Sequence, residues 1–250
     1  MKKILMLLAV AMLTVPGLAL AASAVVTTLY GTAQVQTGSA PPRALRQGDE
    51  VQQGDTVITG PRSNLVMKFD DGEVVGMTGG SRMTVTAYQY NRTQRTGNVL
   101  LSLLQGGMRA ITGWIGRTQP ESVRYRAVTA TIGIRGTDVT IVTVGGNVVV
   151  SVTEGAVTFT YGGQTIVIPA GAGAYGADGK ITQDAAQAIY NKLPPDLQEM
   201  LNGLNGLTDA LNRAGPGIER DDTGNGDNRG VTPGTNVPPG GAGGGTSSSR

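Results

Sequence analysis

The sequence contains neither cysteine nor histidine among its 250 residues, and only 4% of them are aromatic. These absences remove disulfides, thiol nucleophiles, imidazole bases and nearly every zinc or copper site. A hydrolase with a Ser-His-Asp triad is excluded. An enzyme would have to rely on carboxylates, as in glycan cleavage by two acids. No pair is singled out among the candidates, which are Asp49, Asp55, Asp70, Asp71, Glu73, Glu121, Asp138 and Glu154, so we expect no catalytic activity.

Long hydrophobic runs are also missing. The longest, Ile4 to Val15, follows Lys2 and Lys3 and precedes the small-x-small sequence Ala19-Leu20-Ala21. It is too short to span a bilayer, which takes about 20 residues, and the pattern is typical of a cleaved signal peptide. We therefore interpret residues 1–21 as a signal peptide and expect a periplasmic or secreted mature chain without a membrane span.

The charge balance argues against an anionic polymer as a general partner. Without Lys2 and Lys3 the 20 Lys and Arg residues fall to 18, which equals the number of Asp and Glu residues. The pI near 9.0 therefore owes much to the signal peptide, and no basic cluster with interleaved aromatic residues is present. We expect no nucleic-acid partner.

Short runs of alternating apolar and polar residues, separated by glycine, extend over residues 22–181 and predict closely spaced strands. The runs are Ala24–Leu29, Asn64–Phe69, Arg82–Ala87, Val123–Val128, Asp138–Val144, Asn147–Val152 and Ala156–Tyr161. Asp71-Gly72, Gly145-Gly146 and Gly162-Gly163 predict hairpin turns between runs. This pattern of strands and turns indicates an all-β domain, built as a compact multi-stranded roll, a sandwich or a short β-solenoid.

Two Gly-Asp steps, Gly48-Asp49 and Gly54-Asp55, recur six residues apart in this region. We interpret them as turns in which glycine takes a positive φ and the aspartate hydrogen-bonds its own turn. A cation site is the alternative, although the oxygen ligands lack the spacing of a calcium loop.

Several longer motifs then occur in a characteristic order. They are LRQGDEVQQGDTVITG, SNLVMKFDDGEVVGMTGGSRMTV, LLQGGMRA, ATIGIRGTDV, VSVTEGAVTF and IPAGAGAYG. Together they resemble the FecR domain family over about residues 26–179. The motif residues, which we expect to be structural, are Gly48, Asp49, Gly54, Asp55, Asp71, Gly72, Arg135, Gly136, Thr137, Glu154 and Gly155.

The resemblance implies a non-catalytic protein-binding module, best known as the periplasmic part of transmembrane anti-sigma regulators. We expect this chain to be a stand-alone exported form, without the sigma-binding segment or the membrane helix. Glu73 stands where the family leads us to expect serine, and Val139 where we expect an aromatic residue. The resemblance implies one or more envelope proteins as partners, of unknown identity.

Arg135 is an unusual residue, since it lies between two glycines in an otherwise apolar strand pattern. Period two places it opposite Ile132 and Ile134. We interpret it as a structural clamp on backbone carbonyls or on Asp70, Asp71 or Glu154, with a partner-facing contact as the alternative.

Gly171-Ala-Gly-Ala-Tyr-Gly176 matches a dinucleotide-binding pattern in letters only. Pro169 precedes it and Asp178-Gly179 follows it, so no helix can open on these glycines. We therefore expect no cofactor.

Beyond residue 181 the pattern becomes helical. Thr182 or Asp184 can cap a short helix, and Pro194-Pro195-Asp196 opens a second one. One stripe of the second helix comprises Leu197, Met200, Leu201, Leu204, Leu207 and Leu211. The stripe either packs on an open end of the β-domain or serves as a docking or self-association surface, which would make the chain a homo-oligomer and a structural envelope component.

The last segment, residues 215–250, consists mainly of Gly, Pro, Ser, Thr and charged residues. Such a composition predicts a disordered tail. The predicted organisation is thus a signal peptide (1–21), a β-domain (22–181), a helical segment (182–214) and a tail (215–250).

Overall fold

The computed structural model describes residues 23–214, so the predicted signal peptide and tail lie outside the described residues. Strands dominate this part of the chain. The first strands are β1 (Ala24–Tyr30), β2 (Ala33–Thr37), β3 (Arg43–Ala44), β4 (Glu50–Val51), β5 (Asp55–Thr59), β6 (Asn64–Phe69), β7 (Val74–Met77) and β8 (Arg82–Asn91). They are followed by β9 (Thr96–Ile111), β10 (Val123–Ala127), β11 (Ala130–Val144), β12 (Asn147–Tyr161), β13 (Gln164–Pro169), β14 (Ala172–Ala177) and β15 (Lys180–Ala185).

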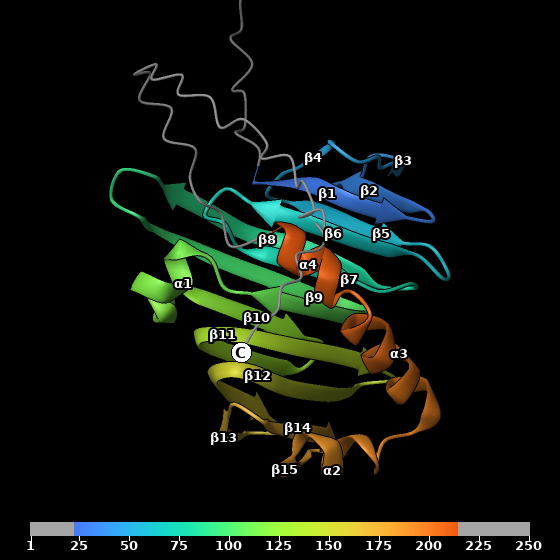
Figure 1. Ribbon diagram of the computed structural model, residues 1–250, viewed down its shortest axis with the longest axis vertical. Coiled ribbons are helices and arrows are strands. Elements are labelled where there is room, and N and C mark those ends of the chain that lie inside the picture. Colours follow the sequence, from blue (N-terminus) through green and yellow to red (C-terminus); the bar gives the residue numbers. More distant parts are fainter. Residues whose placement is uncertain (1–22, 215–250) are drawn as a thin grey trace, which may run out of the picture. The chain divides into compact units, whose positions relative to one another are not determined.

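Helices are short. They are α1 (Trp114–Thr118), the 3₁₀ turn η1 (Pro120–Ser122), α2 (Ala186–Tyr190), α3 (Pro195–Asn205) and α4 (Thr208–Ala214). Of these, α2, α3 and α4 follow the last strand. Figure 1 shows the strands stacked from β1–β4 at one end to β13–β15 at the other, with α3 and α4 lying across them. Within residues 23–214 no helix has the length and apolar character needed to cross a bilayer.

The fifteen strands form one continuous sheet. Every pairing among the described strands is antiparallel except that of β9 with β10. The sheet folds over on itself because three long strands, β9, β11 and β12, each take part in two layers. The first half of β9 pairs with β8 and β10, whereas its second half, from Gly106 onward, pairs with β7 and β11.

The two layers are defined by these pairings. The open layer contains β3, β2, β5, β8, β10, β13, the first halves of β9 and β11 and the second half of β12. The covered layer contains β4, β1, β6, β7, β14, β15 and the remaining halves. The all-β prediction is confirmed, and of the three architectures considered the chain forms a two-layered roll.

Side chains from both layers fill the space between them. This core includes Leu101 and Tyr125 from the open layer and Leu65, Val75 and Ile141 from the covered layer, each fully buried. A second, smaller cluster lies on the other side of the covered layer, under α2, α3 and α4. The open layer has no helix on its outer side within the described residues.

Each long strand changes side-chain parity where it bends. In β11 the core positions are Ile132 and Ile134 before the bend and Val139 and Ile141 after it, so the two sets are an odd number of residues apart. Two consecutive exposed residues, Arg135 and Gly136, take up the extra position as a β-bulge. The bulge keeps the apolar side of the strand facing the core in both layers.

Two motif glycines form the tightest contact in these bends. Gly136 in β11 and Gly155 in β12 both have positive φ, at 55° and 73°. A Cβ on Gly155 would lie 2.1 Å from the carbonyl oxygen of Gly136. Real Cβ atoms cannot approach a carbonyl that closely, so both the backbone conformation and the available space require glycine at position 155.

Several sequence predictions of local structure are confirmed, and others need correction. The hairpins at Asp71-Gly72, Gly145-Gly146 and Gly162-Gly163 form as expected. However, residues 147–152 and 156–161 are one strand, β12, and not two. The bend interrupts the period-two pattern without ending the strand, because hydrogen bonding resumes beyond the bulge.

The boundary between the β-domain and the helices also differs from the prediction. Strand β15 continues to Ala185, where it pairs with Ala172, and α2 begins at Ala186. Asp184 therefore does not cap a helix. Its carboxylate instead accepts hydrogen bonds from Lys192 Nζ at 3.0 Å and from the backbone nitrogen of Ala185 at 2.8 Å.

The close approach of the two bends generates a prediction. Gly155→Ala should destabilise the protein by more than the roughly 1–2 kcal/mol expected for a left-handed non-glycine residue, because its methyl group also meets the Gly136 carbonyl. Gly163→Ala is the matched control, since Gly163 has a φ of 78° and nothing within 4 Å of a Cβ. Urea unfolding of the two variants measures the difference, and equal losses would contradict the close-packing explanation.

Candidate binding surfaces and the buried acidic cluster

In each of the two Gly-Asp turns, the aspartate carboxylate accepts a hydrogen bond from a backbone nitrogen of the same turn. Gly48 and Gly54 both have a φ of 90°. Asp49 Oδ2 accepts a hydrogen bond from the backbone nitrogen of Arg46 at 2.9 Å, and Asp55 Oδ2 accepts one from that of Gln52 at 2.9 Å. Both aspartates therefore serve their own turns, and among residues 23–214 no three acidic side chains gather into a metal-binding group.

The Asp-Gly hairpin between β6 and β7 carries two acids into the interior. Asp71 is 1% exposed and Glu73 is fully buried. Asp71 Oδ1 accepts hydrogen bonds from the Glu73 backbone nitrogen at 3.1 Å and from the Tyr88 hydroxyl at 3.3 Å, and its Oδ2 accepts one from the Ile115 backbone nitrogen at 3.3 Å. The motif residue Asp71 thus links the β6–β7 hairpin to β8 and α1.

Glu73 is less well satisfied. Its Oε1 accepts a hydrogen bond from the Tyr125 hydroxyl at 2.8 Å, but its Oε2 is buried without any partner. Burial raises the pKa of Glu73 well above its usual value, and the neighbouring Asp71 carboxylate adds to the rise. Burial also raises the pKa of Asp71, against the lowering effect of its hydrogen bonds. Since no cation faces Glu73, its neutral form is favoured.

This cluster predicts a stability that decreases with rising pH. Unfolded Glu73 ionises near its usual pKa, whereas folded Glu73 keeps its proton to a higher pH, so the folded state loses relative stability across that window. Each unit of pKa difference corresponds to about 1.4 kcal/mol. Glu73→Gln keeps an acceptor for Tyr125 and removes the ionisation, so it should stabilise the protein at neutral pH and flatten the dependence.

Urea unfolding from about pH 4 to about pH 8 checks this expectation. Glu121→Gln is the control, because Glu121 is an exposed acid in η1. A residual slope from Asp71 is expected in the Glu73→Gln protein, since the pKa of Asp71 is also raised. A slope unchanged from the unmodified protein would show that Glu73 is ionised in the fold.

The Arg-Gly-Thr motif divides into exposed and buried parts. Arg135 is exposed, and its side chain makes no hydrogen bond or ion pair with another described residue, so the interpretation as a structural clamp is wrong. Its side chain faces outward because it alternates with the buried Ile132 and Ile134. Thr137, in contrast, is 4% exposed, and its backbone nitrogen donates to Thr112 Oγ1 at 2.8 Å. Glu154 is exposed beside the bend, opposite Asp138.

A buried ion pair that sequence reasoning missed lies next to this motif. Arg109 in β9 and Asp138 in β11 are 8% and 7% exposed. Arg109 Nε and Nη2 donate to the two Asp138 oxygens at 2.8 and 2.6 Å, a bidentate pairing. Arg109 Nη1 donates to Thr208 Oγ1 of α4 at 2.8 Å. Each residue is a charged residue within an apolar strand pattern, and this pattern could have indicated a buried charge. Which two residues pair, however, depends on the register between β9 and β11.

The predicted leucine stripe lies on the covered layer. Leu197, Leu201, Leu204, Leu207 and Leu211 are between 0% and 6% exposed, and Met200 is partly buried. They pack against Val66, Val74, Val142 and Val149 of the sheet. A fully buried leucine contributes roughly 2 kcal/mol, so in this chain the stripe attaches the helices to the roll. It is not a free docking surface in the folded chain.

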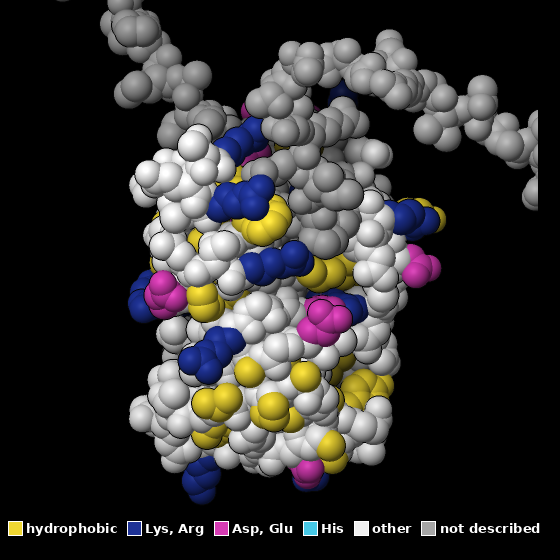
Figure 2. Space-filling view, turned by 60° about the vertical axis from the view of Figure 1, so that its left-hand side comes forward, with side chains coloured by type: hydrophobic (Ala, Val, Ile, Leu, Met, Phe, Trp, Pro, Cys, Tyr) yellow, Lys and Arg dark blue, Asp and Glu magenta, His cyan; other side chains and the backbone are white. Residues whose placement is uncertain are grey.

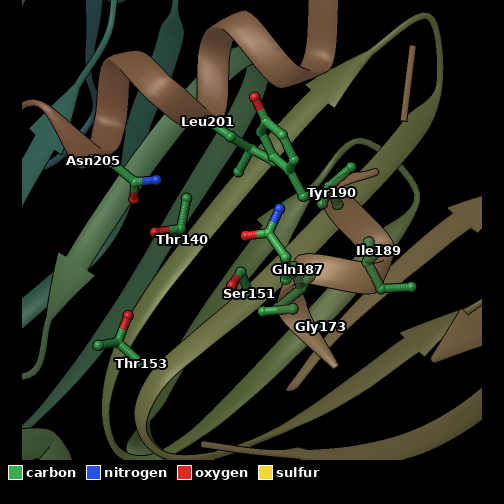
Figure 3. Close-up of a pocket in the computed structure, with 12 residues that line it drawn as sticks. Thr140, Ser151, Thr153, Gly173, Gln187, Ile189, Tyr190, Leu201 and Asn205 are labelled. Atoms are coloured by element: carbon green, nitrogen blue, oxygen red, sulfur yellow. The ribbon is translucent and has the colours of Figure 1, made fainter. Parts of the chain in front are cut away.

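A small pocket remains between these helices and the covered layer (Figure 3). Its volume is about 120 Å³, and its walls include Thr140 and Ser151 from adjacent strands, Gln187 from α2 and Asn205 from α3. No charged side chain lines it. Hydroxyl groups without a neighbouring base are poor nucleophiles, so the pocket is suited to holding a small neutral molecule or water and not to catalysis.

The ion pair at this layer predicts a coupled effect on stability. Arg109→Met should cost about 3–5 kcal/mol, because it leaves Asp138 buried and unpaired. Adding Asp138→Val should recover most of that loss, since two apolar side chains replace the pair. Urea unfolding of the single and double variants measures the recovery, and additive losses in the double variant would refute this account.

The outer side of the open layer is not covered by a helix of the described chain. Its outward positions on β10 and β11 are Arg124, Arg126, Thr131 and Arg135, all exposed. Figure 2 brings forward the left-hand side of Figure 1, where basic side chains stand apart with acidic ones among them and hydrophobic ones gather toward the lower end, the end formed by β12 to β15. The exposed arginines of β10 and β11 make the outer side of the open layer locally basic.

A comparison with protein-family models finds a match that includes several of the motifs. Residues 55–158 match the family model described as FecR protein. This central part of the chain is thus similar to a FecR domain. The match includes the motif residues Asp71, Arg135, Gly136 and Gly155, whereas Gly48-Asp49 and the leucine stripe lie outside it. The family resemblance of the sequence is thus confirmed for the central strands β5 to β12.

Two solved structures are similar to this chain. Both are described as a "putative anti-sigma factor from Parabacteroides distasonis ATCC 8503". The first has 16% identity and a TM-score of 0.43, covering 52% of this chain and 59% of its own. The second has 16% identity and a TM-score of 0.45, covering 60% and 74%. At this identity the likeness concerns the fold alone. No curated protein matches the chain.

Proposed function

We propose that this chain is an exported, non-catalytic FecR-type binding module that mediates protein interactions in cell-envelope signalling or assembly. The observation that carries the proposal is the uncovered outer side of the open layer, in a domain whose other sheet face is covered by its own helices. The FecR match supports the same class of role. Export rests on the pattern of residues 1–21, a basic start, an apolar run and a small-x-small site.

The positions of the acids support a role without catalysis. Asp71 and Glu73 are neighbouring carboxylates in the interior, but they are 1% and 0% exposed and no substrate can reach them. Asp138 is engaged by Arg109, and Asp49 and Asp55 hold their own turns. None of these carboxylates faces a cavity in which two acids could flank a bond.

The packing of the leucine stripe argues against the alternative function, a structural protein that self-associates. Self-association through the stripe needs a helical face that is free to contact a second copy, but the stripe packs on the sheet of its own chain. The open layer remains the surface on which a partner can bind without unfolding any described element.

Site-specific photocrosslinking in the native envelope tests the proposal. A photoreactive residue at Thr131 probes the open layer, and one at Asn202, exposed on α3, is the matched control on the opposite side. We expect a discrete protein adduct from position 131 and none from position 202. Absence of an adduct at 131, or equal adducts at both positions, would refute a partner surface on the open layer.

A further inference from the structure

The open layer is strongly asymmetric in charge. Five arginines occupy exposed positions on its strands: Arg43 in β3 pairs with Asp49, and the other four are Arg82, Arg124, Arg126 and Arg135. Two carboxylates belong to these strands: Asp55, which is 3% exposed and bound to its own turn, and Glu154, which is exposed at the bend of β12. Because the whole chain is nearly neutral, this concentration of positive charge is local, and it will attract an anionic surface over about one Debye length.

The guanidinium groups of these other four arginines are also unengaged. None of them forms an ion pair or a hydrogen bond with another residue of the described chain, in contrast to Arg109, whose donors are occupied by Asp138 and Thr208. Each exposed guanidinium has five N–H donors in a rigid fork that matches a carboxylate. The face therefore offers bidentate positions that the fold itself does not use.

Two of these arginines share a groove. Arg124 and Arg126 line a hollow of about 360 Å³ along β9 and β10, together with Asn98, Leu100 and Ser122. The one acid at this groove is Glu121, which belongs to η1 and not to the strands. Residues two apart on a strand lie about 7 Å apart on one side. Carboxylates at alternate positions of an extended peptide have the same spacing.

Aliphatic side chains distinguish a protein from other anionic partners. Three of the exposed large hydrophobic residues lie on this layer or at its β10–β11 turn: Leu104 at 48%, Val128 at 50% and Val167 at 59% exposure. No aromatic side chain occupies an exposed position on these strands. Nucleic acids and sugar rings are typically bound by stacking on aromatic residues, whereas aliphatic patches beside arginines are typical of protein interfaces.

We propose that the open layer, centred on Arg124 and Arg126, binds an extended acidic segment of a protein partner that carries carboxylates at alternate positions. The inference rests on the proposed binding function and specifies its partner. The carboxylates pair with the arginines in the groove, and the intervening side chains of the segment contact the aliphatic residues around it.

A designed peptide tests the inference directly. The probe is a fluorescent (Glu-Thr)4 peptide, compared with (Gln-Thr)4, and its binding to the full chain is measured by anisotropy at several salt concentrations. We expect binding of the acidic peptide only, weakening as salt rises. Arg124→Gln/Arg126→Gln should weaken it at least tenfold. The control variant, Arg62→Gln/Arg213→Gln, removes the same charge from a turn and from α4, outside the open layer, and should bind normally.

Each contrary outcome overturns the inference in a recognisable way. Equal weakening in both double variants would mean that only net charge matters. Binding of polygalacturonate without binding of the peptide would assign the face to an acidic glycan. If the crosslink from Thr131 persists in the envelope with Arg124→Gln/Arg126→Gln, the acidic-segment inference fails while the binding function stands. Loss of the crosslink, with an unchanged melting temperature, supports both.

Discussion

The fold depends on the bends at which three strands pass from one layer to the other. At the bends of β11 and β12, Gly155 lies so close to the Gly136 carbonyl that position 155 has no room for a side chain. The extra residue at each bend reverses side-chain parity, so that one strand supplies apolar residues to the same core from two layers. Without this reversal, half of each long strand would turn its apolar side chains toward solvent. The glycines of the motifs Arg-Gly-Thr and Glu-Gly are therefore explained by the backbone geometry of the bends.

Two buried polar systems hold the layers in register around these bends. The Arg109–Asp138 pair lies on the covered layer, joins β9 to β11 and reaches α4 through Thr208. The Asp71–Glu73 cluster lies in the β6–β7 hairpin and connects the two layers through the hydroxyls of Tyr88 in β8 and Tyr125 in β10. The first pair is fully satisfied, whereas the second leaves Glu73 Oε2 without a partner. Glu73 also departs from the serine that the family resemblance leads us to expect.

The same architecture separates the molecule into a closed and an open side. Leucines of α3 and α4 cover one sheet face and leave only a small neutral pocket beneath the helices. The other face exposes arginines and aliphatic residues, and Glu154 is its exposed acid at the bend of β12. The face without helices is therefore the one on which the proposed binding role depends.

Local patterns in the sequence determined the strand-rich class, the three glycine turns and the family, because period-two alternation and turn residues act over a few neighbours. They also determined that the leucines of residues 197–211 form one stripe, but not what the stripe contacts. Only the tertiary structure decided that β11 and β12 are single bent strands, that Arg109 and not Arg135 is the buried arginine, and that the stripe lies on the sheet. Each of these outcomes depends on register between strands that are far apart in the sequence, and a one-residue bulge changes which side chains face the core.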